Sequence, residues 1–134
     1  VIGTLKWTLG TVGGKYAQMS NYSGGANYSS EAWFISPAID VSSLSQKTLT
    51  FRNAYKYTGA PLKLFISTNY DGVSAPASAT WTEKTFTLSA GNFVWANSGI
   101  IDLSAYTGNI YIAFKYTGTT SNGSTWEVDD IIIK

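Results

Sequence analysis

Residues that favour β-strands, chiefly Thr, Tyr, Val, Ile, Phe and Trp, occur along this chain in short alternating runs separated by clusters of Gly, Ser and Asn. No stretch keeps a helical period over several turns. The pattern therefore predicts an all-β protein. The expected strands cover residues 4–9, 15–20, 32–36, 47–57, 62–68, 83–88, 93–101, 109–117 and 125–133.

The chain is long enough to build a single hydrophobic core. It has 134 residues, of which 44% are hydrophobic and 15% aromatic. The segment 69–80, NYDGVSAPASAT, is expected to be a long surface loop rather than a linker. No apolar run approaches the roughly 18 residues of a membrane helix, so we expect no membrane insertion. We predict one domain over residues 1–134, cut from a larger secreted protein.

An internal repeat indicates how the strands are arranged. The segments IDVSSLSQKTLTFRNAYKYTG (39–59) and IDLSAYTGNIYIAFKYTG (101–118) share an Ile-Asp-x-Ser opening and a Lys-Tyr-Thr-Gly close. Asp40 and Asp102 are each expected to accept a hydrogen bond from the backbone two residues on, as in an Asx-turn. The repeat predicts two equivalent strands in facing or adjacent sheets of an antiparallel β-sandwich.

Alternation within three strands separates an apolar side from a cationic and aromatic side. The apolar sides hold Leu49, Phe51, Tyr55, Leu62, Leu64, Ile66, Ile110, Ile112 and Phe114. If the three strands are neighbours, their other sides form one basic surface without acids. That predicted ligand-binding surface consists of Arg52, Lys56, Lys63, Phe65, Tyr111 and Lys115.

The predicted basic surface suits a polyanionic glycan. Sulfate and carboxylate groups accept charge-assisted hydrogen bonds from Arg and Lys, and the C–H faces of sugars stack on aromatic rings. The alternative is that these lysines only face solvent and protect sheet edges from pairing. Single-stranded nucleic acid also binds aromatic rings among cations, but the formal net charge of only +1 argues against it.

The five tryptophans divide by sequence context. Trp33 and Trp126 lie in apolar strands and are expected to be buried or half-buried. Trp7, Trp81 and Trp95 lie near expected loops, where any of them could contact a ligand together with nearby tyrosines such as Tyr70.

The residues of common catalytic sites are missing. The chain has no Cys and no His, and it contains neither a nucleophile elbow nor a phosphate-binding Gly loop. A glycoside hydrolase needs two carboxylates across a cleft, and the candidates Glu31, Asp71, Glu83 and Glu127 form no recognisable motif. We therefore expect no catalytic residues and no enzymatic activity.

Calcium is the one metal that the composition favours, because it binds carboxylates and carbonyls and needs neither His nor Cys. The segment WEVDD places Asp129 and Asp130 together in an apolar strand, and regular alternation points them to opposite faces. We predict a structural Ca²⁺ at this strand. Asp71 with Gly72 is a weaker alternative in the loop.

Several ordered segments resemble the choice-of-anchor J and cleaved-adhesin group of secreted Bacteroidetes modules. They are KYAQMSNYSGGANYSSEAWFISPAID, LTF, LFISTNYDG, IDLSAYTGNIYIAFKYTG and TWEVDDIIIK, which together cover nearly the whole chain. The resemblance implies a jelly-roll β-sandwich of the MAM and carbohydrate-binding kinds, and a structural calcium with Asp129 as first ligand and Asp130 as second. Family members usually begin with an extra strand bearing an acidic residue ahead of the segment matching Trp7, whereas this chain starts at Val1.

Taken together, the sequence predicts a non-catalytic carbohydrate-binding module for an acidic or sulfated polysaccharide. Its expected partners are that polysaccharide and a glycan-degrading catalytic domain in the same parent polypeptide, with no nucleic acid, and we expect a monomer that is secreted or at the cell surface. The alternative is an adhesin-like domain that binds another protein.

Overall fold

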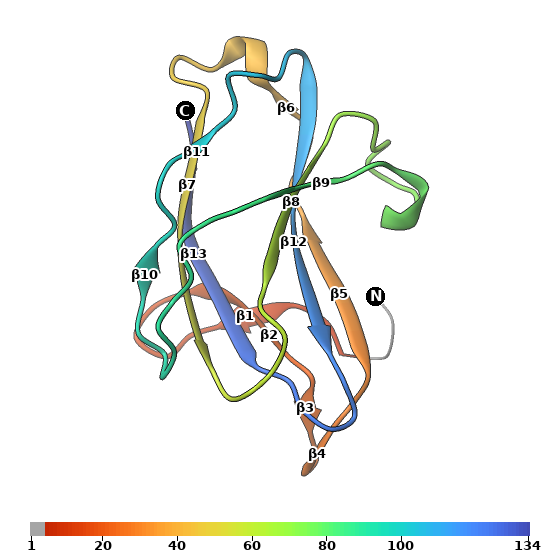
Figure 1. The fold of residues 1–134 in the computed structure, drawn as a ribbon, viewed down its shortest axis with the longest axis vertical. Helices are drawn as coiled ribbons and strands as arrows, with labels where there is room; N and C mark the ends of the chain where they lie inside the picture. The colour runs from red at the N-terminus through yellow and green to blue at the C-terminus, as the bar shows by residue number, and fades with distance from the viewer. Residues whose placement is uncertain (1–4) are drawn as a thin grey trace.

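The computed structural model describes residues 5–134, which form two antiparallel sheets packed face to face with a small hairpin at one end (Figure 1). The first sheet has the order β1-β2-β13-β7-β10, and β11 also pairs with β7. Its strands are β1 (Thr8–Gly10), β2 (Tyr16–Ser20), β7 (Thr48–Lys56), β10 (Ala96–Asn97), β11 (Ile101–Asp102) and β13 (Thr125–Ile133). The predicted antiparallel β-sandwich is therefore confirmed, while the jelly-roll connectivity stays a prediction.

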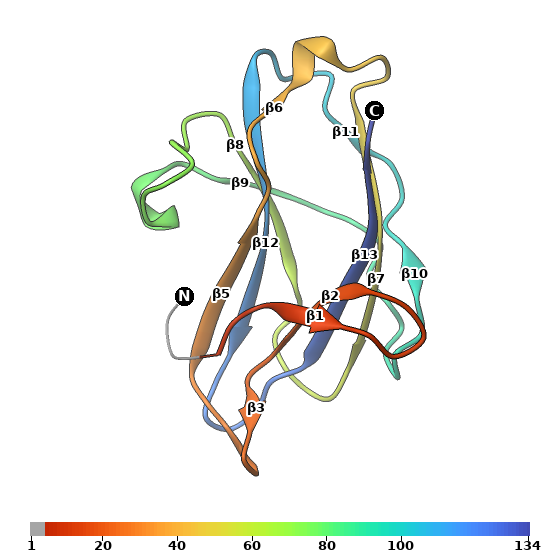
Figure 2. The same cartoon turned by 180° about the vertical axis from the view of Figure 1, so that it is seen from behind.

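The second sheet has the order β5-β12-β8-β9, and β6 also pairs with β12. Its strands are β5 (Ser30–Ile35), β6 (Ile39–Asp40), β8 (Lys63–Ser67), β9 (Thr82–Lys84) and β12 (Asn109–Gly118). The remaining elements are the hairpin β3 (Tyr22–Ser23) and β4 (Ala26–Asn27) and the 3₁₀ turns η1 (Val41–Ser43) and η2 (Pro76–Ser78). Figure 2 shows the two sheets from behind, with the β3–β4 hairpin below them.

The internal repeat corresponds to a reciprocal exchange between the sheets. The Ile39–Asp40 strand precedes β7 in the chain but pairs with β12, whereas the Ile101–Asp102 strand precedes β12 but pairs with β7. Asp40 accepts a hydrogen bond from the Ser42 N–H (2.9 Å) and Asp102 from the Ser104 N–H (2.8 Å). The predicted Asx-turns are confirmed, and the two equivalent strands lie in facing sheets.

The core lies between the sheets and follows the predicted alternation. Phe51 of β7 contacts Phe114 of β12 edge-on, with ring centroids 4.8 Å apart, and Trp126 of β13 is 1% exposed. Side chains of the predicted apolar sides are buried, except that Tyr55 is half-buried and stacks on Trp126. The predicted buried and outer sides of these strands are confirmed, because successive side chains of a strand point to opposite faces of the sheet.

The predicted strand boundaries were inaccurate between residues 83 and 101, whereas the expected strands 109–117 and 125–133 match β12 and β13 closely. The expected strand 83–88 is reduced to β9, and the expected strand 93–101 contains only the two-residue β10 before β11 begins. Positive φ angles at Asn92 (52°) and Phe93 (56°) interrupt an extended run there. β3, β4 and β6 were not predicted, and residue 4 of the first expected strand lies outside the described residues.

A buried asparagine ties together the loops at the hairpin end. Asn21 is 0% exposed, and its Nδ2 donates hydrogen bonds to the carbonyls of Tyr28 (2.9 Å), Thr119 (2.8 Å) and Asn122 (3.1 Å). The Tyr116 hydroxyl accepts from the Asn21 N–H at 3.1 Å and donates to the Ser124 carbonyl at 2.6 Å. These contacts satisfy loop carbonyls that β-pairing leaves free.

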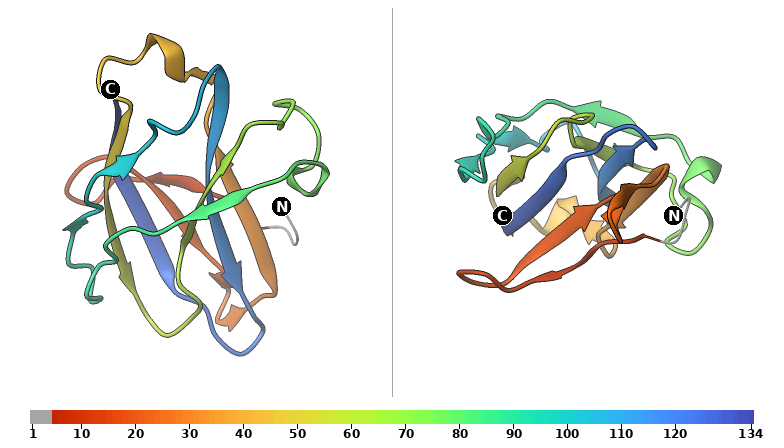
Figure 3. Two further views of the ribbon diagram at one scale, coloured as in Figure 1. Left: turned by 45° about the horizontal axis from the view of Figure 1, so that its top comes forward. Right: turned by 90° about the horizontal axis from the view of Figure 1, so that it is seen from below.

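The loop 69–80 projects from the β8 end of the second sheet, away from the first sheet (Figures 1 and 3). Asp71 organises it by accepting hydrogen bonds from the N–H groups of Val73 (2.9 Å) and Ser74 (2.8 Å). These bonds, with one from the Ser74 hydroxyl, lower the pKa of Asp71 to about 2. The predicted surface loop is thus confirmed. Among residues 5–134, no helix has the length and apolar character needed to cross a membrane.

Candidate functional site on the outer faces of the sandwich

The predicted single basic surface is wrong, because its residues divide between the two outer faces of the sandwich. Arg52 and Lys56 lie on β7 in the first sheet. The other four, Lys63, Phe65, Tyr111 and Lys115, lie on β8 and β12 in the second sheet. Alternation assigns a side within each strand, but it does not say which strands share a sheet.

The second outer face also contains acids. Lys63 Nζ lies 3.7 Å from Glu83 Oε2, and Lys115 Nζ lies 3.5 Å from Glu31 Oε2. The carboxylates come from the flanking strands β9 and β5, which were not considered when the face was predicted to be free of acids. Both lysines therefore already have a counter-charge.

Five half-buried aromatic rings form a continuous cluster on this face, which we call the aromatic face: Trp33, Phe65, Tyr70, Trp81 and Tyr111. Trp33 is central, with ring centroids 5.6 Å from Phe65 and 5.2 Å from Trp81. Tyr70 continues the row, 5.3 Å from Trp81 and 5.1 Å from Tyr111. The cluster spans β5, β8, β12 and the base of the loop 69–80, and it groups two residues predicted for the binding surface with three that were not.

Hydrogen bonds orient three of the five rings of the aromatic face, those of Trp33, Tyr70 and Trp81. Trp33 Nε1 donates to Glu31 Oε1 at 3.0 Å, while Lys115 Nζ lies 5.2 Å from the Trp33 ring centroid. The bond from Trp33 is the main reason that the pKa of Glu31 is lowered, with Lys115 adding to the effect against the opposing effect of burial. Trp81 Nε1 donates to the Pro76 carbonyl at 2.8 Å and the Tyr70 hydroxyl to the Ser74 carbonyl at 2.8 Å.

Sequence reasoning missed the central role of Trp33, although a signal was present. Alternation in β5 puts Trp33 on the same side as Glu31 and opposite the buried Ala32, which already indicates an outward direction. Tyr70 and Trp81 were named as possible ligand contacts near loops, but alternation could not place them on this face, because their position depends on how the loop 69–80 folds back on the sheet.

The cations of the first outer face are also engaged. Arg52 Nη1 lies 3.7 Å from Asp130 Oδ2, and the guanidinium lies 5.4 Å from the Trp95 ring centroid. Lys56 Nζ lies 5.5 Å from the ring centroid of its chain neighbour Tyr57. Arg52 and Lys56, the remaining residues of the predicted basic surface, thus already contact side chains of this protein on the first outer face.

A β-bulge explains the adjacent carboxylates of β13. The register with β7 shifts between Asp129 and Ile132, and Asp130 has a φ of 49°. The bulge brings the Asp130 carboxylate to Arg52, which is the register partner of Asp129. The prediction that the two carboxylates point to opposite faces is therefore wrong, because regular alternation ends at the bulge.

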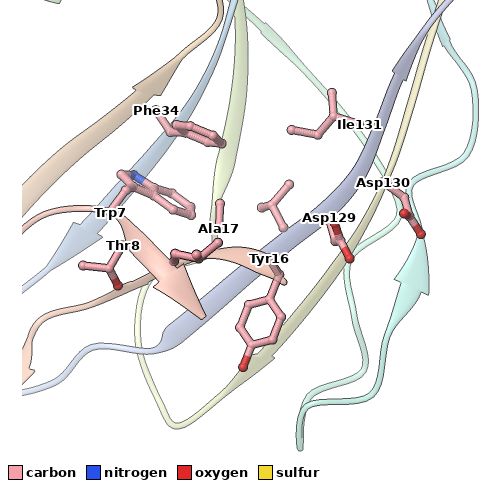
Figure 4. A pocket seen from close by; sticks show the side chains of 10 residues that line it. Trp7, Thr8, Tyr16, Ala17, Phe34, Asp129, Asp130 and Ile131 are labelled. Atoms are coloured by element: carbon pink, nitrogen blue, oxygen red, sulfur yellow. The ribbon is translucent and has the colours of Figure 1, made fainter. Parts of the chain in front are cut away.

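The residues at the bulge do not fit a calcium site. Calcium takes about six to eight oxygen ligands, whereas Asp130 is paired with a cation and no group of three or more acidic, His or Cys side chains occurs within residues 5–134. Figure 4 shows Asp129 and Asp130 at one end of a pocket whose other end is formed by Trp7 and Phe34. In the loop, Asp71 uses both carboxylate oxygens for its own turn.

The four carboxylates considered for hydrolysis do not form a pair across a cleft. Glu31 and Glu83 are ion-paired on the second outer face, Asp71 caps the loop turn, and Glu127 lies on the first outer face. This arrangement gives no support to a two-carboxylate mechanism. The absence of catalytic residues stays a prediction.

Among residues 5–134, Glu127 is the one buried acid, at 7% exposure. It lines a hollow of about 350 Å³ on the first outer face together with Tyr16, Gln18, Phe93, Trp95 and Thr125. Burial raises the pKa of Glu127, and a hydrogen bond from Tyr16 opposes that rise. Burial, and then the nearby Glu127 charge, raise the pKa of Tyr16.

An apolar groove lies where the two sheets separate beside β13. Its lining includes Phe34 of β5 and Ile131 and Ile133 of β13, and it has a volume of about 320 Å³. β2 pairs with β13 only as far as Val128, so the strand beyond that residue has no partner on this side within residues 5–134.

Comparison with known proteins finds no matching family model, curated protein or solved structure. The resemblance to the choice-of-anchor J and cleaved-adhesin group accordingly stays a prediction.

Proposed function

We propose that this chain is a non-catalytic carbohydrate-binding module whose binding surface is the aromatic face. The observation that carries the proposal is the row of five half-buried rings on the solvent side of one sheet. Aromatic rings stack on the C–H faces of sugars, and they contribute large contact areas at low conformational cost. Polar groups beside the rings, chiefly those of Glu31 and Lys115, are available for sugar hydroxyls.

The hydrogen-bonded orientation of Trp33, Tyr70 and Trp81 supports binding rather than packing alone. Trp33 is held by Glu31 and Lys115, and Trp81 by the carbonyl of Pro76. Ordering these side chains during folding reduces the entropy lost when a ligand binds.

The charges of the aromatic face favour a neutral or weakly charged glycan. The prediction of an acidic or sulfated polysaccharide depended on unopposed cations, but Lys63 and Lys115 are each within 3.7 Å of a carboxylate. An anionic ligand would have to compete with Glu83 and Glu31. We therefore expect retention to change little with salt, because a neutral glycan forms no ion pair that salt could screen.

We further propose that the module serves a glycan-degrading catalytic domain in the same parent polypeptide, as a monomer in a secreted or cell-surface protein. This follows from the resemblance to secreted Bacteroidetes modules and from the absence of a recognisable catalytic motif. When the module is bound to a polysaccharide, the catalytic domain linked to it has a higher effective concentration at the same polymer.

Affinity electrophoresis against neutral, uronic and sulfated polysaccharides tests the proposal. We expect retardation by at least one neutral polymer, and a loss of about tenfold in affinity for Trp33→Ala. Trp95→Ala, which alters a ring beside the opposite outer face, is the matched control and should be retarded like the wild type. Retardation only by sulfated or uronic polymers, or equal retardation of Trp33→Ala, would contradict it.

The second candidate is an adhesin-like domain, which the apolar groove beside β13 favours. Ile131 is 41% exposed there, in a groove lined mainly by apolar side chains. Exposed apolar patches often mark protein contacts. If this function applies, Ile131→Asp abolishes capture of a protein partner and leaves any glycan retention unchanged. No retention on the glycan panel, together with such a capture, would favour this candidate.

A further inference from the structure

The hollow around Glu127 contains a carboxylate with no cationic partner. Glu127 is 7% exposed, and its nearest neighbours across the sheet are Gln18 of β2 and Ala54 of β7, which carry no charge. None of the ion pairs among residues 5–134 involves Glu127. A buried carboxylate normally has a cation, hydrogen-bond donors or a proton, and within residues 5–134 Glu127 has a hydrogen bond from Tyr16 but no cation.

The two cations on the same face are directed elsewhere. Arg52 and Lys56 flank Ala54 on β7, so either could have approached Glu127 from a diagonal position. Arg52 instead pairs with Asp130 at 3.7 Å and lies over Trp95, while Lys56 lies over Tyr57. The lining of the hollow therefore contains one acid and no base.

The other lining groups are oxygen acceptors and aromatic rings. The Gln18 and Thr125 side chains make no hydrogen bond within residues 5–134, which leaves an amide oxygen and a hydroxyl beside the carboxylate. Tyr16 and Trp95 meet edge to face with centroids 5.7 Å apart, and Phe93 lies beside them. Three oxygen acceptors surrounded by rings match the three N–H donors and the positive charge of an ammonium group.

We propose that the Glu127 hollow is a binding site for a primary ammonium group, such as that of an amino sugar or a lysine side chain. The site is separate from the aromatic face, since it lies on the opposite sheet. A hydroxyl of a neutral sugar offers one donor and no charge, so it satisfies the carboxylate less completely. The raised pKa of Glu127 fits a group that is short of a counter-charge.

Calorimetric titration of the full chain tests the site with three probes: a glucosamine oligomer with free amines, its N-acetylated counterpart and a short lysine peptide. We expect the free-amine oligomer to bind, and Glu127→Gln to weaken that binding by about tenfold or more. Asp102→Asn makes the same charge change at a distant turn and should stay within about twofold of the wild type. Binding of the lysine peptide with the same dependence on Glu127 would support the ammonium site and identify a protein source for the amine.

The outcomes separate this site from the proposed glycan surface. Equal binding of the acetylated and free-amine oligomers, unchanged binding by Glu127→Gln, or no binding of either amine would overturn the ammonium site. Trp33→Ala should leave amine binding intact. If amine binding depends on Glu127 but no neutral polysaccharide is retained, the glycan proposal fails and the ammonium site stands.

Discussion

At the scale of single residues, Glu127 should reduce the stability of the free protein at neutral pH. Its pKa is raised in the folded state, so the folded protein holds this proton up to a higher pH than the unfolded chain does. Between the unfolded and folded pKa values, the contribution of Glu127 to the free energy of unfolding therefore falls as pH rises. Above the pKa of Glu127 in the folded state, this contribution to the free energy of unfolding falls no further.

We predict that Glu127→Gln raises the free energy of unfolding at pH 7 and has a smaller or no stabilising effect in acid. Urea unfolding of both proteins between about pH 4 and pH 8 measures the difference, in which the titration of the other carboxylates largely cancels. Destabilisation by Glu127→Gln at neutral pH would show that the ionised carboxylate makes favourable contacts in the free protein.

The carboxylates at the bulge of β13 lead to a prediction about calcium. Because Asp130 is paired with Arg52 and no group of three or more acidic, His or Cys side chains occurs within residues 5–134, we expect a saturating chelator to leave the melting temperature unchanged. Thermal unfolding with and without chelator and added calcium measures this. A fall of several degrees with chelator would mean that the folded state binds the ion after all.

At the scale of elements, the hydrogen bonds of Asn21 hold three loop segments together. Asn21→Ala removes three donor contacts and, within residues 5–134, leaves the Thr119 carbonyl without a hydrogen-bond donor, so we predict a loss of about 2–4 kcal/mol in the free energy of unfolding. Asn27→Ala is the control, because the Asn27 amide makes a single long contact to the Ser121 carbonyl at 3.5 Å. Denaturant titration should show a much smaller change for the control, and similar losses for both variants would refute the role of Asn21.

Features of individual elements were predictable where the sequence of a single strand or turn determines them. The burial of Leu49, Leu64 and Ile112 follows from alternation alone, and the Asx-turns follow from Asp40 and Asp102. The grouping of β7 with β8 and β12 failed because sheet membership depends on pairing between segments far apart in the chain. The bulge at Asp130 was equally unpredictable, since its conformation is set by the pairing of β13 with β7.

At the scale of the whole molecule, the sandwich separates two chemically different faces. The second sheet presents the aromatic face, whereas the first sheet presents the acidic hollow around Glu127. The sequence placed Lys63, Phe65, Tyr111 and Lys115 together correctly, but it could not show that Glu31 and Glu83 neutralise the two lysines. The aromatic cluster itself needs the tertiary fold, because Trp33, Tyr70 and Trp81 come from separate segments.

The five indole N–H groups offer the most direct test of glycan binding by the aromatic face. They are distributed over the core, the aromatic face and the Glu127 hollow, so their NMR signals report on each location separately. With an oligosaccharide of a retained neutral polymer, we predict shifts for Trp33 and Trp81 and unchanged signals for Trp126 and Trp95. Shifts confined to Trp95 or Trp7, with Trp33 and Trp81 unchanged, would contradict the account.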